Sequence, residues 1–123
     1  MSNTKIEISK TFTFDAAHHF NHKDNDHPFS KLHGHSFVGT VTLTGERDNA
    51  SGMINDFWDI DQVLQSIKSD LDHCLLNDVP GLENPSLENI ASWVFQRLET
   101  ILPNLIRVQV CRPSCGESAS VSK

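Results

Sequence analysis

The chain has 123 residues, of which 37% are hydrophobic and 21% are charged. That length and composition predict one soluble globular domain over residues 1–123, large enough to bury a substantial core. The formal net charge of −6 argues against nucleic acid as a main partner, because phosphate binding needs clustered Lys and Arg. No run of about 18 apolar residues is present, which excludes a membrane-spanning helix and a membrane partner.

The N-terminal sequence and the cysteines indicate the cellular compartment of the protein. The segment from Met1 to Lys10 is polar and lacks the apolar stretch of a secretory signal. The three cysteines are few and odd in number, which does not suit a disulfide framework. We therefore expect a cytoplasmic protein with reduced thiols.

Strand patterns occupy the first half of the chain. Apolar and polar residues alternate from Ile6 to Phe14, with Lys10 the one break in phase, and this predicts a long strand with one buried face. Positions 35–44 alternate in the same way and predict a second strand. After a polar turn over 45–52, Met53 to Phe57 is expected to form a short third strand, so the middle of the chain is predicted to be a hairpin.

Helical patterns follow. Apolar residues recur at three- and four-residue steps from Ile60 to Leu71, and Asp56 or Asp59 is placed to cap this helix. A second helix is expected to start at 84–86, with Pro85 in its first turn, and its apolar stripe runs to Ile101.

The end of the chain completes the predicted sheet. Positions 106–110 alternate as a fourth strand, and the end of the small polar tail from Ser114 to Lys123 is expected to be mobile. Helices grouped between strands predict an α+β fold, a four-stranded antiparallel sheet with both helices on one face. Such a sheet has two exposed edges that invite pairing with other subunits, so we expect a homo-oligomer.

Histidines carry the clearest chemical signal. His33 and His35 are two residues apart, so in a strand both side chains point to the same face. His18, at the end of the first predicted strand, could add a third imidazole. Three imidazoles suit zinc and leave its fourth position open, as in catalytic zinc sites. A solvated His-rich loop without a specific metal site is the alternative.

Four segments resemble one known family. These are 12–18 (Phe-Thr-Phe-Asp-Ala-Ala-His), 32–37 (Leu-His-Gly-His-Ser-Phe), 71–73 (Leu-Asp-His) and 76–85 (Leu-Asn-Asp-Val-Pro-Gly-Leu-Glu-Asn-Pro). Their order and spacing resemble the 6-pyruvoyl-tetrahydropterin synthase and 6-carboxytetrahydropterin synthase family, and most of all its bacterial 6-carboxytetrahydropterin synthases. The resemblance extends with little or no gap from about Phe12 to Arg112.

This resemblance implies a fold, a metal and a reaction. It implies the tunnelling fold (T-fold), in which trimers close their sheets into a barrel, two trimers stack as a hexamer, and active sites lie between subunits. It implies Zn2+ on His18, His33 and His35 and a small-molecule pterin substrate. In the bacterial branch, 7,8-dihydroneopterin triphosphate becomes 6-carboxy-5,6,7,8-tetrahydropterin, acetaldehyde and triphosphate, on the route to 7-deazaguanine and queuosine.

An acid–base pair is also implied. Asp72 and His73 match the family's catalytic Asp-His pair, in which the carboxylate orients the imidazole and raises its basicity. The plainer interpretation is that Asp72 caps the end of its helix and His73 interacts with the helix dipole.

Two positions depart from the family pattern. The family's cysteine (in some branches a glutamate) four residues before the His-Gly-His motif is Phe29 here, which cannot accept a proton. The glutamate that anchors the pterin ring in the family falls on Arg112, and a guanidinium only donates hydrogen bonds. The nearby thiols of Cys74 and Cys111 are candidates for the missing group, although small buried cysteines are the simpler interpretation.

Three explanations of these departures stay open. Other side chains could substitute, with Asp26, His27 or Ser30 near the cysteine's place and Glu117 turned back to hold the ring. The ligand could differ, since Arg112 suits a carboxylate, a phosphate or a carbonyl edge, and Phe29 could stack on a planar ring. The chain could also have kept its ligand and lost the chemistry. The competing functions are therefore a zinc-dependent pterin lyase, a divergent relative with a pterin-like substrate, a zinc- and ligand-binding module without turnover, and a metal-free oligomeric scaffold.

Overall fold

The computed structural model describes residues 4–21, 24 and 26–123. Its strands are β1 (Ile6–His18), β2 (His33–Gly45), β3 (Leu105–Arg112) and β4 (Glu117–Ser122). Its helices are α1 (Phe57–Leu71) and α2 (Leu87–Glu99), with single 3-10 turns η1 (Pro28–Ser30), η2 (Leu76–Asp78) and η3 (Pro113–Cys115). No helix of the described part is long and apolar enough to cross a membrane.

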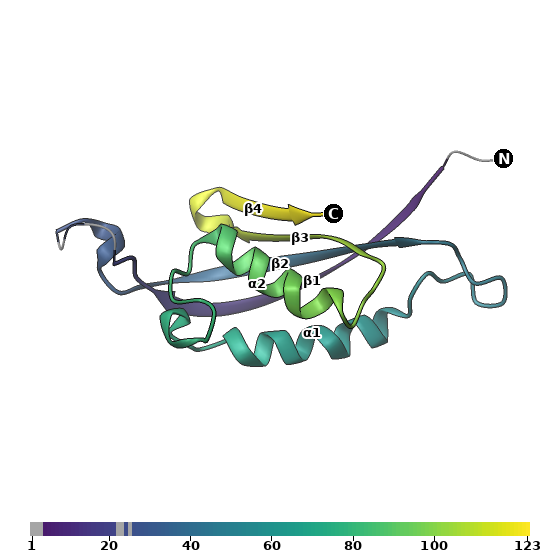
Figure 1. The fold of residues 1–123 in the computed structure, drawn as a ribbon, viewed down its shortest axis with the longest axis horizontal. Coiled ribbons are helices and arrows are strands. Elements are labelled where there is room, and N and C mark those ends of the chain that lie inside the picture. Colours follow the sequence, from purple (N-terminus) through teal and green to yellow (C-terminus); the bar gives the residue numbers. More distant parts are fainter. Residues whose placement is uncertain (1–3, 22–23, 25) are drawn as a thin grey trace.

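The four strands form one antiparallel sheet in the order β1-β2-β3-β4. Helix α1 packs against β1, and α2 packs against β3 and β4, so the two helices cover one face (Figure 1). Asp56 caps α1 by accepting from the Trp58 N–H, and Ser86 caps α2 by accepting from the Asn89 N–H. Pro85 therefore precedes the cap of α2 and does not lie in its first turn. The α+β class predicted from the sequence is confirmed.

The assignment of the sheet's strands differs from the prediction at two places. Met53 to Phe57 is not a strand, because Asp56 begins a helix there, and the side chains of Met53 and Phe57 are about half exposed. The tail whose end is predicted to be mobile instead contains β4, which pairs with β3 from Arg112↔Glu117 to Arg107↔Ser122. Two small apolar side chains, Ala119 and Val121, pack on the core and hold β4 in place.

One face of the sheet carries the core, and one end of that face carries the polar site. The core-facing rows are Phe12, Phe14 and Ala16 on β1, Phe37 and Val41 on β2, Val108 and Val110 on β3, and Ala119 and Val121 on β4. Side chains alternate along a strand, so each of these rows continues into a polar side chain at one end of the sheet. These polar side chains are His18 on β1, His35 and His33 on β2, Arg112 on β3 and Glu117 on β4.

Amide hydrogen exchange tests the fourth strand. The amides of β4 that bond to β3 are expected to exchange more slowly than unstructured amides, because exchange then requires opening of the ladder. The measurement is hydrogen–deuterium exchange on peptides covering 117–122. Complete exchange at the first time point would instead mean a mobile tail.

Gly39 on β2 leaves room for the bulky Phe12 side chain on β1. It lies opposite Phe12, and a Cβ at position 39 would clash with the Phe12 ring. Gly39→Ala is therefore expected to lower the free energy of unfolding by about 1–3 kcal/mol, measured by urea denaturation. Gly34→Ala is the matched control on the same strand, because its Cβ would stand 3.4 Å from the Ala16 carbonyl oxygen, an ordinary contact. Equal losses in the two variants would contradict this account of the packing.

Candidate metal centre

Three imidazoles meet where β1 ends and β2 begins. His18 pairs directly with His33 across the two strands, and Ala16 pairs with His35, so all three histidines share the core-facing side. One ring nitrogen from each lies within 4.8 Å of the other two. His18 is fully buried, whereas His33 and His35 are partly exposed, so the cluster has a solvent-accessible side. The sequence-predicted triad is thus brought together.

Backbone carbonyls orient two of these rings. His18 Nδ1 lies 3.0 Å from the Pro85 carbonyl oxygen, just before α2, and His33 Nδ1 lies 2.7 Å from the Lys31 carbonyl oxygen. A carbonyl only accepts, so each Nδ1 carries the proton and each neutral ring keeps its lone pair on Nε2. A carbonyl partner on the second nitrogen is the usual way in which a metal-binding histidine is held.

Two atoms indicate that the triad suits a metal. Among the described residues, Nε2 of His18 and Nε2 of His35 are buried and have no hydrogen-bond partner. Such orphaned nitrogens are costly unless something occupies the space between them. Burial lowers the pKa of His18 to about 4, although the bond to Pro85 opposes this, and the nearby imidazoles of His33 and His35 add to the lowering. Burial also lowers the pKa of His35. Both rings are therefore neutral at pH 7, as metal ligands must be.

Phe29 lies beside the triad. It sits in η1, whose start is capped by His27, and its ring stacks on His33 with 6.3 Å between centroids and 28° between planes. Its side chain is about half exposed, so it forms an apolar wall of the site. Of the proposed substitutes for the missing cysteine, Ser30 donates to the His27 carbonyl, and His27 Nδ1 accepts from the Phe29 N–H.

Asp72 and His73 form the hydrogen-bonded pair that their sequence suggests. His73 Nδ1 lies 2.9 Å from Asp72 Oδ2, at the end of α1. The Asp15 backbone N–H donates to Asp72 Oδ1 at 2.9 Å, and together with the bond to His73 this holds the pKa of the Asp72 carboxyl below its usual range. Asp72 is therefore an anion that fixes the orientation of the imidazole.

The backbone at His73 is strained. Its φ of 58° lies in the left-handed region that glycine favours, and among the described non-glycine residues it alone has positive φ. The His73 N–H donates to the Asp15 carbonyl at 2.7 Å, and the Ala17 N–H donates to the Cys74 carbonyl. The segment 72–75 therefore runs along the edge of β1 that faces away from β2. A strained non-glycine residue at such a turn is typical of a functional position.

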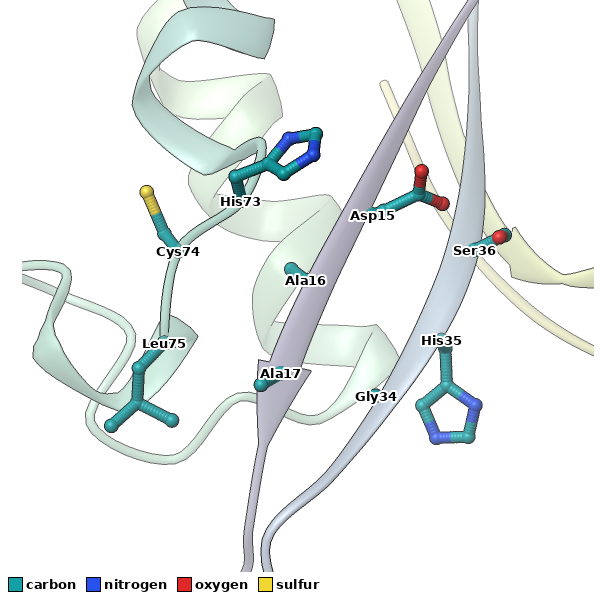
Figure 2. Close-up of a pocket in the computed structure, with 9 residues that line it drawn as sticks. All are labelled: Asp15, Ala16, Ala17, Gly34, His35, Ser36, His73, Cys74 and Leu75. Atoms are coloured by element: carbon teal, nitrogen blue, oxygen red, sulfur yellow. The ribbon is translucent and has the colours of Figure 1, made fainter.

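The Asp72–His73 pair does not reach the triad of its own chain. Both His73 and His35 line a cavity of about 580 Å3 along β1 and β2. Figure 2 shows the His73 ring beside Asp15 at one end of this pocket and the His35 ring at the other end, turned away from it. The His73 side chain is 81% exposed. The imidazole of the Asp72–His73 pair is thus presented to solvent at the edge of the sheet.

Arg112 and Glu117 form a cross-strand ion pair on the side of the triad nearest β3. Arg112 Nη2 lies 3.0 Å from Glu117 Oε1, and the Arg112 side chain is only 14% exposed. The sequence predicts that Arg112 and Glu117 both lie at the site. Their side chains point to the same face of the sheet as His35, which agrees with that prediction. Cys111 points to the opposite face of the sheet, as alternation requires.

Three contacts of the site could not be identified from residue types. The carbonyls of Pro85 and Lys31 carry no side-chain signature. Cys115 Sγ lies 3.9 Å from His35 Nδ1, because η3 folds over the start of β2. In the sequence, only Pro113 and Gly116 indicate a turn after β3, and a turn at this place is what brings Cys115 back toward β2.

Comparison with known proteins identifies the family. The family model described as 6-pyruvoyl tetrahydropterin synthase matches residues 7–123. This chain therefore belongs to the 6-pyruvoyl tetrahydropterin synthase family.

Relatives with different activities match most of the chain. A Synechocystis 6-carboxy-5,6,7,8-tetrahydropterin synthase is 40% identical over 91% of this chain and 89% of its own length. A Pyrococcus furiosus dihydroneopterin monophosphate aldolase is 32% identical over 85% of each chain. The human 6-pyruvoyl tetrahydrobiopterin synthase is 31% identical over 80% of this chain and 78% of its own.

A solved structure confirms the fold. The Caenorhabditis elegans 6-pyruvoyl tetrahydropterin synthase superimposes with a TM-score of 0.85 at 22% identity, covering 98% of this chain and 96% of that one. The predicted T-fold architecture, a four-stranded antiparallel sheet with two helices, is thereby confirmed.

Substitution of the triad tests the metal site. His33→Ala is expected to weaken zinc binding by more than about 100-fold, because it removes one of three ligands, whereas loss of an outer contact costs about 10–100-fold. Zinc content after dialysis against a chelator series measures this. His27→Ala is the matched histidine control, since His27 caps η1 and is not part of the cluster. Unchanged zinc content in His33→Ala would exclude the triad.

The buried triad also predicts a pH dependence of stability. The folded protein keeps His18 neutral down to about pH 4, whereas the unfolded chain protonates it near pH 6.5. The unfolded state thus binds more protons between these values, and the metal-free protein should lose stability, up to about 3 kcal/mol, as pH falls through that window. Urea denaturation at a series of pH values measures this, and His18→Gln should flatten the slope. An equal slope in His18→Gln would contradict it.

Proposed function

We propose that this protein is a zinc-dependent carbon–oxygen and carbon–carbon lyase acting on 7,8-dihydroneopterin triphosphate. With one water consumed, the products would be 6-carboxy-5,6,7,8-tetrahydropterin, acetaldehyde and triphosphate, on the route to 7-deazaguanine and queuosine. The observation that carries the proposal is the His18–His33–His35 cluster, with its two orphaned buried nitrogens, in a member of this family. The 40% identity to a 6-carboxy-5,6,7,8-tetrahydropterin synthase supports this particular reaction.

The donor set favours zinc. Three imidazoles with an open side match catalytic zinc sites, and the exposed side of His33 and His35 leaves room for a substrate. Bound zinc would polarise the side-chain oxygens of the substrate and make them more acidic. The Phe29 ring beside His33 limits water on one flank. The described residues thus supply a metal-binding cup with an apolar wall.

Asp72 and His73 are proposed as the proton-transfer pair. The Asp15 N–H holds Asp72 as an anion, and the Asp72 carboxylate accepts from His73 Nδ1–H. His73 Nε2 is then free to accept a proton from the substrate. The strain at His73 is accounted for if the imidazole must project at this point of the turn.

The active site is proposed to form between subunits. Strands β1 and β4 are the two edges of the sheet, and alternation of strand direction lets β4 of one copy pair antiparallel with β1 of another. That pairing brings the Glu117 end of β4 toward the residues of the neighbouring β1 that precede Asp15, because segment 72–75 of that copy occupies the edge at Asp15 and Ala17 and presents the exposed His73 there. The triad of one copy and the acid–base pair of the next then face one cleft, in a trimer or hexamer.

A second candidate is a related reaction on a pterin-like substrate. Phe29 and Arg112 stand where the family places a cysteine or glutamate and a ring-anchoring glutamate. The similarity to a dihydroneopterin monophosphate aldolase supports the idea that this fold accommodates more than one pterin carbon–carbon cleavage. A zinc- and ligand-binding module without turnover is the remaining alternative.

The direct test is product formation. Zinc-loaded protein incubated with 7,8-dihydroneopterin triphosphate is expected to release acetaldehyde and a new pterin, measured by an aldehyde assay and chromatography. Absence of product, together with a gain of activity in the Phe29→Cys, Arg112→Glu double variant, would contradict the proposed lyase and favour the altered or lost function.

Subunit complementation tests the shared site. His33→Ala and His73→Ala are each expected to be inactive alone, because one lacks the metal and the other the base. Co-expressed in equal amounts, they should recover about a quarter of wild-type activity, since random mixing leaves that fraction of shared sites intact. Co-expression of His33→Ala with His35→Ala is the control and should recover nothing. No recovery in the first pair would contradict a site shared between copies.

A further inference from the structure

An unpaired donor beside the triad indicates what the site binds besides a metal. Nε of Arg112 is buried and has no hydrogen-bond partner among the described residues. The Glu117 carboxylate accepts from Nη2 of the same guanidinium, so this ion pair leaves the Nε–H donor of Arg112 unsatisfied. A buried cationic donor without a partner is costly, and a ligand acceptor would remove that cost.

The position of Arg112 places these donors next to the metal ligands. On β3 it continues the core-facing row of Val108 and Val110, and on β2 the facing row runs from Phe37 to His35. In the β2–β3 register Val38 pairs with Cys111, so Arg112 stands opposite Phe37 and diagonal to His35. Diagonal neighbours on adjacent strands are about 7–8 Å apart, which is within reach of a long side chain such as arginine.

The charge of the site favours an anion. Glu117 neutralises Arg112 but nothing more, so a divalent ion on the neutral triad would leave the site positive. A guanidinium matches carboxylate and phosphate oxygens through parallel N–H donors.

We propose that Arg112 binds a carboxylate or phosphate oxygen of the ligand at the triad, from the strand next to the one that carries His33 and His35. Arg112 is thus a specificity-determining residue, and the ligand class is a molecule with a metal-binding oxygen and an anionic group nearby. The inference rests on the proposed function only in taking the triad as a ligand site. Glu117 acts as a positioning residue, because it fixes the guanidinium through Nη2 and leaves Nε directed elsewhere.

A purely structural ion pair is the competing explanation, and the chain contains a matched example. On the same strand, Arg107 Nη2 lies 3.3 Å from Glu7 Oε2, and that pair is well exposed. Arg107 has the same partner type but stands at the far end of β3 from the triad. It therefore serves as the internal control for general anion binding by a surface arginine.

The experiment follows the guanidinium directly. The sequence has four arginines, so an 15N spectrum of Arg Nε–H groups is sparse, and Arg112→Lys identifies the Arg112 signal. Inorganic phosphate, acetate and uncharged acetamide are titrated into zinc-loaded and metal-free protein. The Arg112 Nε–H signal is expected to shift with phosphate or acetate and not with acetamide, while the Arg107 signal stays in place.

Affinities are measured by calorimetry on the same proteins. Arg112→Met is expected to weaken binding of the preferred anion by about tenfold or more, and Arg107→Met to leave it unchanged. Tighter binding of acetate identifies a carboxylate-bearing ligand, and tighter binding of phosphate identifies a phosphate-bearing one. An unshifted Arg112 signal, an equal response to acetamide, or equal affinity in Arg112→Met would overturn the proposal.

The outcome is separable from that of the proposed function. Anion binding is read from the guanidinium signal and from heat, without turnover of a pterin. Arg112-dependent anion binding without product from 7,8-dihydroneopterin triphosphate would leave this inference standing and reject the lyase. Product formation with an unresponsive Arg112 would do the reverse.

Discussion

The pairing register of β1 and β2 is the constraint on which the site depends. It places His18 opposite His33 and Ala16 opposite His35, so three imidazoles share one face at one end of the sheet. A slip by one residue would turn every side chain of one strand to the other face and separate the ligands. The stacked rings of Phe14 and Phe37, 4.8 Å apart, and the fit of Phe12 over Gly39 stabilise this register from within the core. The hydrophobic core thus sets the geometry of the metal centre.

The remaining parts of the site come from segments that are distant in sequence. The start of α2 supplies the carbonyl that holds His18, and the turn before β2 supplies the one that holds His33. The β3–β4 hairpin brings Arg112 and Glu117 to the same end of the sheet. Each contact needs the strand order β1-β2-β3-β4, so the fold and the site are specified together.

Side-chain spacing made part of this arrangement predictable. The pattern His-Gly-His fixes two rings on one face of any strand, and a polar residue ending an apolar strand marks His18 as a third. The strand at β4 was missed because its alternation uses Ala119 and Val121 among serines, which is a weak signal without the edge of β3 beside it. The segment 53–57 was misassigned because Met53 and Phe57 are exposed, and only the Asp56 cap reveals the start of a helix. Contacts through backbone carbonyls cannot be predicted from residue types.

The placement of His73 argues that the isolated chain is not the functional unit. A left-handed backbone at a non-glycine residue costs of the order of 1–3 kcal/mol, and the fold could avoid it with glycine. The imidazole held there by Asp72 makes no contact with the triad in its own chain and is largely exposed. The segment that carries it occupies the edge of β1 beside Asp15 and Ala17, so this edge is built to hold His73 outward. Under the proposed function, strain of this kind is accounted for because the outward imidazole would meet the candidate metal centre of a neighbouring copy, and assembly would then be a condition for chemistry and not only for stability.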